Sequence, residues 1–417
     1  MRRALAFFAL FLAVTAEAAP RQWIVARRDG AQAPAAWLWQ NAYPLAATAL
    51  PAPDYDLEPL RRMIGDAQII GLGDGTHGTH EFYTSKLRII DFLVRKMNVD
   101  VIAFEAPFTL FNQLDEYVQS GTGDPRALLI EADDRLGYRF WRVEEMLDVV
   151  EWMRDYNINR GIAPAVHIAG ADMYDRAGST AAVVAYLRPL DATAADEAHQ
   201  QYSCSPSIEC ADQSRAVRET LEGRRAELEP RTGARAFNEA VQNARVAEQS
   251  IRSLVNRDQF MAVNTEWLLQ YWSTSKRIVM WAHQEHIGKA PSDWVPGEKP
   301  MGAFLAEAVG DAYFTIGSLT GSGSVRQWVH QGGQPPEAVV TNVPEAVEGS
   351  YESYFRLRPA PALLVPLNGT LPEWLSKESR YFAAGVSPFQ TESMVSLPAK
   401  VDAVIYIEHT TPTQPFE

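Results

Sequence analysis

Seven short apolar runs recur along this 417-residue chain and alternate with longer segments. The runs lie at residues 67–73, 99–105, 165–171, 277–282, 313–319, 362–367 and 403–408. The segments between them carry apolar residues at helical spacing, as in EFYTSKLRIIDFLVRKM and VEEMLDVVEWMRDY. Strands that are apolar along their whole length and alternate with helices are typical of a sheet covered on both faces. The sequence therefore predicts an α/β fold, with a mostly parallel or mixed central sheet flanked by helices.

One long segment, residues 190–275, interrupts this alternation, because it contains no strand-like run and is rich in Ala, Glu, Arg and Gln. We expect a pair of helices there, inserted into the α/β core as a lid or wall over a cleft. The catalytic core then comprises residues 61–189 and 276–417, preceded by an N-terminal arm at 19–60. Residues 321–360, rich in Gly, Gln and Pro, are expected to be loops with little regular structure.

The first eighteen residues, MRRALAFFALFLAVTAEA, have the pattern of a secretory signal peptide, with two arginines, an apolar stretch and a small-x-small end. We expect cleavage before Ala19 and a secreted or periplasmic protein. A retained anchor is disfavoured because the apolar stretch is shorter than the roughly 20 residues that span a bilayer. No later segment is apolar and long enough to enter a membrane. In an oxidising compartment, Cys204 and Cys210 are expected to form a disulfide across a small loop.

The charge balance limits the class of partner. Thirty-eight basic and 52 acidic side chains give a formal net charge of −14. An acidic surface argues against nucleic acid and anionic membranes as partners, so a small molecule is the expected ligand. The oligomeric state is not determined by the sequence.

Ionisable residues follow four of the predicted strands. Parallel strands bring their carboxyl ends to one edge of the sheet, where ligands bind in open α/β folds. The residues are Asp74, His77, Glu105, Asp172, His283 and His286. Each acid has a structural alternative: Asp172 is equally well placed to cap a helix, and Glu105 to complement a helix dipole. His77 stands out, since glycines at 75 and 78 flank it and allow close approach of a substrate.

Several blocks of the sequence resemble the erythromycin esterase family. They occur in the family's order over about three fifths of the chain, from residue 66 to 320. The blocks are GLGDGTHGTHEFYTSKLRIIDFLV, VDVIAFEAPF, GYRFWRVEEMLDVVEWMRDYN, GADM, RDQFMAVNTEWLL, WAHQEHI and MGAFLAEAVGDAYFTIG.

The resemblance implies hydrolysis of a macrolide lactone or similar bulky ester, with His77 as the general base that activates water. It places Glu105, His283 and His286 around the catalytic cleft, and Lys86 where the family carries a basic side chain. Arg257 and Asn264 match the helical block. Seven residues apart, this pair shares one helix face, and we expect both side chains to bind substrate.

One position departs from the family pattern. The motif usually reads G-E-x-T-H-G, and this chain has Asp74 in place of the glutamate. The carboxylate is one methylene shorter, so Asp74 can orient His77 only if the backbone approaches closely, which Gly75 permits. Otherwise Asp74 acts through a water molecule, or the activity is weakened or redirected.

The chemistry also follows from the residues themselves. A neutral imidazole with a neighbouring acid is a natural general base for attack of water on an ester. His283, His286 or Lys86 would then supply hydrogen-bond donors to the tetrahedral intermediate. The sequence contains no G-x-S-x-G nucleophile motif, which disfavours an acyl-serine route.

Two alternatives stay open. In the first, Asp74, His77, Glu105, His283 and His286 bind zinc or manganese in a metal-dependent hydrolase of another substrate. In the second, the protein is a catalytically weakened member that only binds its ligand, as the Asp74 departure hints. On the favoured hypothesis no cofactor is required, while a divalent metal is kept open.

Overall fold

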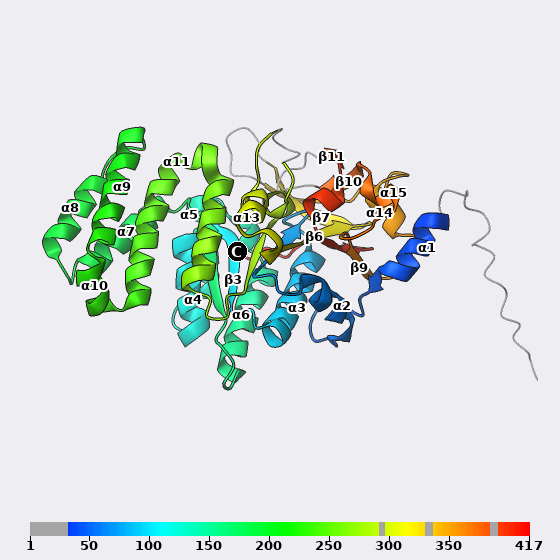
Figure 1. Ribbon diagram of the computed structural model, residues 1–417, viewed down its shortest axis with the longest axis horizontal. Helices are drawn as coiled ribbons and strands as arrows, with labels where there is room; N and C mark the ends of the chain where they lie inside the picture. The colour runs from blue at the N-terminus through cyan, green and yellow to red at the C-terminus, as the bar shows by residue number, and fades with distance from the viewer. Residues whose placement is uncertain (1–31, 292–296, 330–336, 384–390) are drawn as a thin grey trace, which may run out of the picture.

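The computed structural model describes residues 32–291, 297–329, 337–383 and 391–417 (Figure 1). Within these ranges a central sheet has the strand order β1-β9-β12-β6-β2-β5-β3-β4. Its strands are β1 (Tyr43–Pro44), β2 (Ile69–Asp74), β3 (Val101–Pro107), β4 (His167–Asp172), β5 (Ile278–His283), β6 (Tyr313–Thr320), β9 (Ala362–Pro366) and β12 (Ala403–Ile407). The strands from β12 to β4 are parallel, whereas β9 is antiparallel to β12 and β1 to β9. The predicted sheet is confirmed, and each of the seven apolar runs forms one of its strands.

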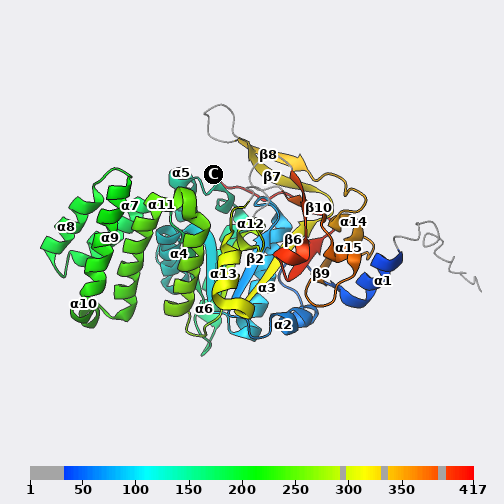
Figure 2. The same ribbon diagram turned by 45° about the horizontal axis from the view of Figure 1, so that its top comes forward.

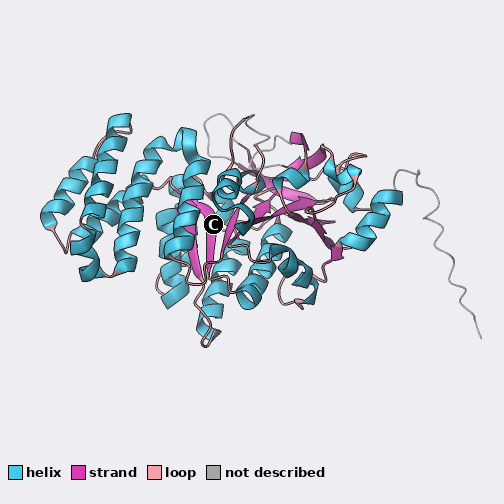
Figure 3. Cartoon of the chain, viewed as in Figure 1, coloured by secondary structure: helices cyan, strands magenta, loops and turns pink. Residues whose placement is uncertain are grey.

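Helices cover both faces of this sheet, so the core has three layers (Figure 3). In β2, Ile70 and Leu72 belong to one apolar core, and Ile69 to the core on the opposite face. The first core includes α2 (Glu58–Ile64), α3 (His80–Met97), α4 (Phe108–Ser120), α5 (Pro125–Leu136) and α6 (Glu144–Asn159). The second includes α1 (Gln32–Asn41), α11 (Ala234–Tyr271), α13 (Met301–Val309), α14 (Tyr351–Phe355), α15 (Glu373–Ser376) and α16 (Leu397–Lys400). Burial on both faces explains why the strands are apolar at every position.

A group of helices extends from one end of the sheet (Figures 1 and 2). It contains α7 (Arg176–Leu187), α8 (Ala192–Tyr202), α9 (Ile208–Gly223), α10 (Arg225–Thr232) and part of α11, around a small apolar core of their own. The prediction that 190–275 is helical is confirmed, but the expected pair of helices is wrong, because α8 to α11 all lie there. The side chains of Asp191 and Ser207 cap α8 and α9, and divide the segment into helices too short to show a clear period.

A disulfide joins Cys204, in the turn after α8, to Cys210 in the first turn of α9, which confirms the expected bond. The predicted signal peptide lies outside the described residues, so cleavage before Ala19 stays a prediction. In the part of the chain that the structure describes, no helix has the length and apolar character needed to cross a bilayer.

Helix α11 folds back on itself. In a straight helix, residues 22 positions apart would be separated by about 33 Å. Instead, Nε2 of Gln242 donates to Oδ1 of Asn264 at 2.7 Å, and the amides of Gln249 and Asn264 exchange two hydrogen bonds. The two arms of α11 therefore lie side by side (Figure 1). Nδ2 of Asn264 also donates to the carbonyl of Ala171 at 2.8 Å, which ties the second arm to the end of β4.

We expect Asn264→Ala to lower the free energy of unfolding by about 3 kcal/mol, because it leaves buried amide and carbonyl groups without partners. Urea denaturation followed by circular dichroism measures this. Gln259→Ala, at an exposed position on the same arm, serves as the control and should leave stability unchanged. Unchanged stability of Asn264→Ala with a raised KM would instead favour the original expectation that Asn264 binds substrate.

The segment 321–360 has more regular structure than predicted. Strands β7 (Ser324–Val329) and β8 (Glu337–Asn342) form an antiparallel pair, and α14 follows them. The expectation of loops is wrong here because these strands gain their stability from tertiary contacts. For example, the backbone N–H of Arg326 donates to the carbonyl of Gly78 at 2.9 Å. A second small sheet pairs β10 (Ser379–Ala383) with β11 (Thr391–Val395).

Candidate active site

Four neighbouring strands end at one point of the sheet edge and bring the predicted polar residues together. Asp74 ends β2, His283 ends β5, Glu105 lies near the end of β3 and Asp172 ends β4. Asp74 and His283 are direct partners in the parallel register. The short helix α12 (Gln284–Ile287) begins immediately after β5 and carries His286. As expected, the site forms at the carboxyl ends of the strands, where loops and helix N-termini converge.

Asp74 contacts His77 directly. Its Oδ2 lies 2.9 Å from Nδ1 of His77, while its Oδ1 accepts from Nε1 of Trp281 at 2.9 Å and pairs with Nζ of Lys86. A carboxylate facing Nδ1 places the ring proton on that nitrogen, so Nε2 keeps its lone pair. The shorter acid therefore needs no bridging water. Gly75 permits the tight turn, because a Cβ there would lie 2.8 Å from the carbonyl oxygen of Ser318.

Lys86 is buried behind Asp74. Besides its ion pair with Asp74, its ammonium lies 4.7 Å from the centre of the Trp281 ring. Burial lowers the pKa of Lys86 well below its ordinary value, and the charge of Glu105 opposes this. Lys86 thus stabilises the carboxylate of Asp74. The sequence suggested that Lys86 binds substrate, but its side chain is buried behind that acid.

The His77 ring is buried against two other rings. It stacks on Phe140 with 4.2 Å between ring centres and lies 4.9 Å from the ring of His283. Burial lowers its pKa to about 4; the charge of Glu105 opposes this shift, and those of His286 and Arg257 reinforce it. The imidazole is therefore neutral at physiological pH, as a general base requires.

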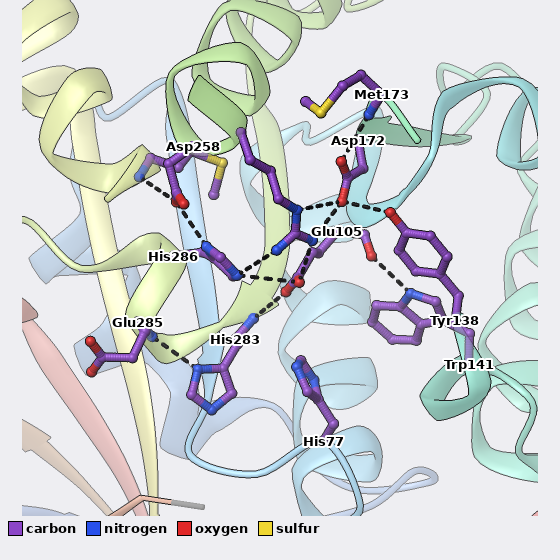
Figure 4. A network of polar contacts seen from close by, with 12 residues as sticks. His77, Glu105, Tyr138, Trp141, Asp172, Met173, Asp258, His283, Glu285 and His286 are labelled. Atoms are coloured by element: carbon purple, nitrogen blue, oxygen red, sulfur yellow. Dashed lines mark hydrogen bonds and ion pairs between the residues drawn. The ribbon is translucent and has the colours of Figure 1, made fainter. Parts of the chain in front are cut away.

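A second group of charged side chains, with Glu105, Asp172 and His286, lies beside His77 (Figure 4). Arg257, from the second arm of α11, is at its centre. Nη2 of Arg257 is 2.8 Å from Oε1 of Glu105, and Nε is 3.0 Å from Oδ2 of Asp172. Oδ2 of Asp172 also accepts from the hydroxyl of Tyr138 at 2.6 Å. The acids on β3 and β4 thus share one guanidinium.

His286 completes this group. Its Nδ1 lies 2.8 Å from Oδ1 of Asp258, and its Nε2 lies 3.3 Å from Oε1 of Glu105 and 3.0 Å from Nη1 of Arg257. A protonated ring can donate only to Glu105, whereas Arg257 can donate only to a neutral ring. Burial lowers the pKa of His286, but the charges of Glu105 and Asp258 outweigh it and raise the pKa to about 10. We therefore assign the protonated form to His286. The carboxylates of Glu105, Asp172 and Asp258 then face two positively charged side chains, Arg257 and His286.

His283 lies between these two groups. Its backbone N–H donates to Oε2 of Glu105 at 3.0 Å, and its Nδ1 accepts from the backbone N–H of Glu285 at 3.2 Å. The ring proton is therefore on Nε2. Burial, then the neighbouring His77, lowers the pKa of His283 well below its ordinary value, while a hydrogen bond with the Gly75 backbone raises it. His283 thus joins β3, α12 and the loop that carries His77.

A family model of erythromycin esterases matches residues 94–410 of this chain. The chain belongs to the erythromycin esterase family. Among curated relatives, the putative hydrolase YbfO of Bacillus subtilis (strain 168) is 23% identical over 427 residues, covering 90% of this chain and 91% of that protein. Erythromycin esterase type II of Escherichia coli is 22% identical over 314 residues, covering 64% of this chain and 72% of that protein.

Solved structures share the fold of this erythromycin esterase family member. A Bacillus cereus protein superposes with a TM-score of 0.82 at 24% identity, covering 92% of this chain and 99% of that one. A mutant of the erythromycin esterase EreC in its open conformation gives a TM-score of 0.68 at 17% identity, covering 89% and 98%. The α/β architecture with its helical extension is therefore that of the family.

Most of the site residues suggested by the sequence come together in the structure. Eight of the nine lie in the two groups around His77 and Arg257: Asp74, His77, Lys86, Glu105, Asp172, Arg257, His283 and His286. Asn264 does not join them, since its amide is bonded to Gln242, Gln249 and Ala171. The helix-cap alternative for Asp172 is wrong, because Asp175 caps α7 by accepting from the N–H of Gly178.

Four residues of the site were not expected from the sequence: Trp281, Asp258, Phe140 and Tyr138. Trp281 lies two residues before His283 in β5, so the period-two pattern of the strand could have indicated it. Asp258 follows Arg257 directly, and this adjacency could have indicated it. Phe140 and Tyr138 lie in and just before the short helix η4 (Arg139–Trp141), within the block GYRFWRVEEMLDVVEWMRDYN, but no spacing in that block indicates what their rings contact. Only the fold brings their rings to His77 and Asp172.

The arrangement does not fit the metal alternative. Within the described residues, no three or more His, Cys, Asp or Glu side chains are grouped so that they could hold a metal ion. The carboxylate oxygens of Asp74 and Glu105 already accept from protein N–H groups or pair with basic side chains.

We expect NMR titration of the His77 ring to show a neutral imidazole from pH 8 down to about 5, with a change near pH 4. His80 is the internal control, because its hydrogen bond to Glu145 raises its pKa above 6.5. In the unfolded chain the His77 ring binds its proton near pH 6.5. The contribution of the neutral His77 to the free energy of unfolding is therefore fully present above pH 6.5 and is lost as the pH falls from 6.5 through 4. Titration of His77 near 6.5 would contradict the buried, neutral ring.

Proposed function

We propose that this chain hydrolyses a macrolide lactone or a similar bulky ester, with His77 activating water. Membership of the family and the curated names of relatives support a hydrolase. The ester or lactone substrate is our inference from relatives named as erythromycin esterases. The observation that carries the mechanism is the direct Asp74–His77 contact, which leaves Nε2 of a neutral imidazole free to accept a proton.

In this mechanism, Nε2 of His77 takes a proton from water while the water oxygen bonds to the carbonyl carbon. Asp74 holds the Nδ1–H and stabilises the imidazolium that forms, as the acid of a catalytic triad does. In this proposal, N–H donors of Arg257 and His286, the two positively charged side chains beside His77, stabilise the negative charge that develops on the carbonyl oxygen. His77 then returns the proton to the departing alkoxide, and the carbon–oxygen bond of the ester breaks.

Direct attack by water is favoured over an acyl-enzyme. In the described part of the chain, no hydroxyl or thiol side chain is hydrogen-bonded to the His77 ring, whose bonded partner is Asp74. The nearest hydroxyl in the sequence, that of Thr76, is paired with Thr79. A serine or cysteine nucleophile would need to lie within hydrogen-bond reach of its base.

The test is mass spectrometry of erythromycin and of a panel of lactones and esters after incubation with the protein. We expect a gain of one water, reduced about 10²–10⁴-fold in His77→Asn, since the base is removed. His199→Gln, on the exposed surface of α8, is the matched histidine control and should keep full activity. Equal turnover by His77→Asn would show that the base is another residue. Binding without turnover by the unmodified protein would favour the ligand-binding alternative.

Chelation separates our proposal from a metal-dependent hydrolase. We expect activity to survive EDTA treatment and dialysis, because Asp74 and Glu105 are engaged by protein donors. Elemental analysis of the dialysed protein checks that no stoichiometric zinc or manganese remains. Loss of activity that zinc or manganese restores would support the metal-dependent alternative.

A further inference from the structure

A segment more than 300 residues away in the sequence runs along the loop that carries His77. We call residues 410–416 the bracing segment. The backbone N–H of Thr413 donates to the carbonyl of Gly78 at 3.1 Å, and the N–H of His80 donates to the carbonyl of Thr411 at 2.9 Å. Between these bonds, Thr79 and Pro412 form an antiparallel β-bridge. All three residues that follow His77 are therefore paired with the bracing segment.

Strand β7 holds the same loop from another direction. The carbonyl of Gly78 accepts a second hydrogen bond, from the backbone N–H of Arg326 at 2.9 Å, and Nε of Arg326 donates to the carbonyl of Thr413 at 2.9 Å. The approach is close, because a Cβ on Gly78 would lie 2.0 Å from the carbonyl oxygen of Arg326. Gly78 thus lies between β7 and the bracing segment.

The far end of the bracing segment is fixed to the start of α6. The carboxylate of Glu145 accepts from the backbone N–H of Gln414 at 3.1 Å and lies 2.7 Å from Nδ1 of His80. The side chain of Arg142 donates to the carbonyl of Phe416 at 2.9 Å. The preceding helix η4 contains Phe140, on which the His77 ring stacks. One local region therefore anchors both the bracing segment and the ring that packs on His77.

Helix α3 needs this support because it begins without a side-chain cap. Its N-cap residue, Thr79, makes no side-chain hydrogen bond to the first turn. The first N–H groups of a helix require partners, which a capping side chain usually supplies. Here the carbonyl of Thr411 accepts from the N–H of His80 instead. The start of α3, and with it the end of the His77 loop, depends on the bracing segment.

We propose that residues 410–416 are a positioning element that holds His77 against Asp74 and Phe140. The protection of the His77 ring follows from this contact whether or not the protein is an esterase; only the effect on turnover rests on the proposed function. A displacement of about 1 Å at a catalytic group can cost on the order of 10²-fold in rate.

The test removes one backbone donor by Thr413→Pro, while Thr413→Ala keeps that N–H. Pro412 is already in a β-bridge, so it has the extended backbone that a following proline requires. Modification by diethyl pyrocarbonate is mapped by tandem mass spectrometry, which distinguishes His77 from His80 within one tryptic peptide. We expect His77 in Thr413→Pro to react at least tenfold faster than in the unmodified protein, and in Thr413→Ala to stay protected.

Turnover provides an independent measurement. Once kcat is normalised to the folded fraction measured by circular dichroism, we expect it to fall at least tenfold in Thr413→Pro with little change in KM, as a displaced base predicts. Arg326→Ala, which removes only the side-chain bond to Thr413, is the second variant should Thr413→Pro fail to fold. Wild-type protection of His77 in both folded variants would overturn the proposal. If His77 is labelled faster in Thr413→Pro but no form of the protein cleaves any ester, the positioning role of the bracing segment is supported and the proposed function is rejected.

Discussion

The buried carboxylate of Asp74 is the interaction on which the site depends. A carboxylate is stable away from water only when its oxygens are bonded, and Asp74 meets this need with His77, Trp281 and Lys86. These contacts also fix the proton of His77 on Nδ1. The ion pair with Lys86 lies behind the acid, so it compensates charge without competing for Nε2 of the base. By holding Asp74 with Trp281 and Lys86, the fold also sets the tautomer and the orientation of His77.

Within one small site, His77 is neutral and His286 is protonated, and each state has its own physical cause. His77 is packed between Phe140 and His283, so burial dominates and its ring stays neutral. His286 is buried as well, but the carboxylates of Glu105 and Asp258 face its two nitrogens and keep it charged. The parallel strands make this possible, because adjacent carboxyl ends bring a neutral base and a charged group side by side. A neutral proton acceptor next to charged N–H donors is the combination that our proposed hydrolysis by water uses.

Distant parts of the chain complete this arrangement. The second arm of α11 carries Arg257 to the acids of β3 and β4, and the amide of Asn264 fixes that arm to the carbonyl of Ala171. The bracing segment and β7 hold the backbone that follows His77. The second arm of α11 therefore packs on the sheet and reaches the site, while the first arm packs with α7 to α10 around their own apolar core.

The sequence by itself determined the strands, the class of fold and most of the site. Each of these follows from local pattern: apolar runs specify buried strands, and residues at the ends of parallel strands must meet at one edge. The sequence could not place Asn264 or Lys86, because spacing along a helix indicates a shared face but not what that face meets. It also missed Phe140, Tyr138 and the strands β7 and β8, whose roles rest on contacts with residues far away in the chain. Only the tertiary structure decided which nitrogen of His77 is free and what holds that ring in place, because both depend on groups brought together by folding.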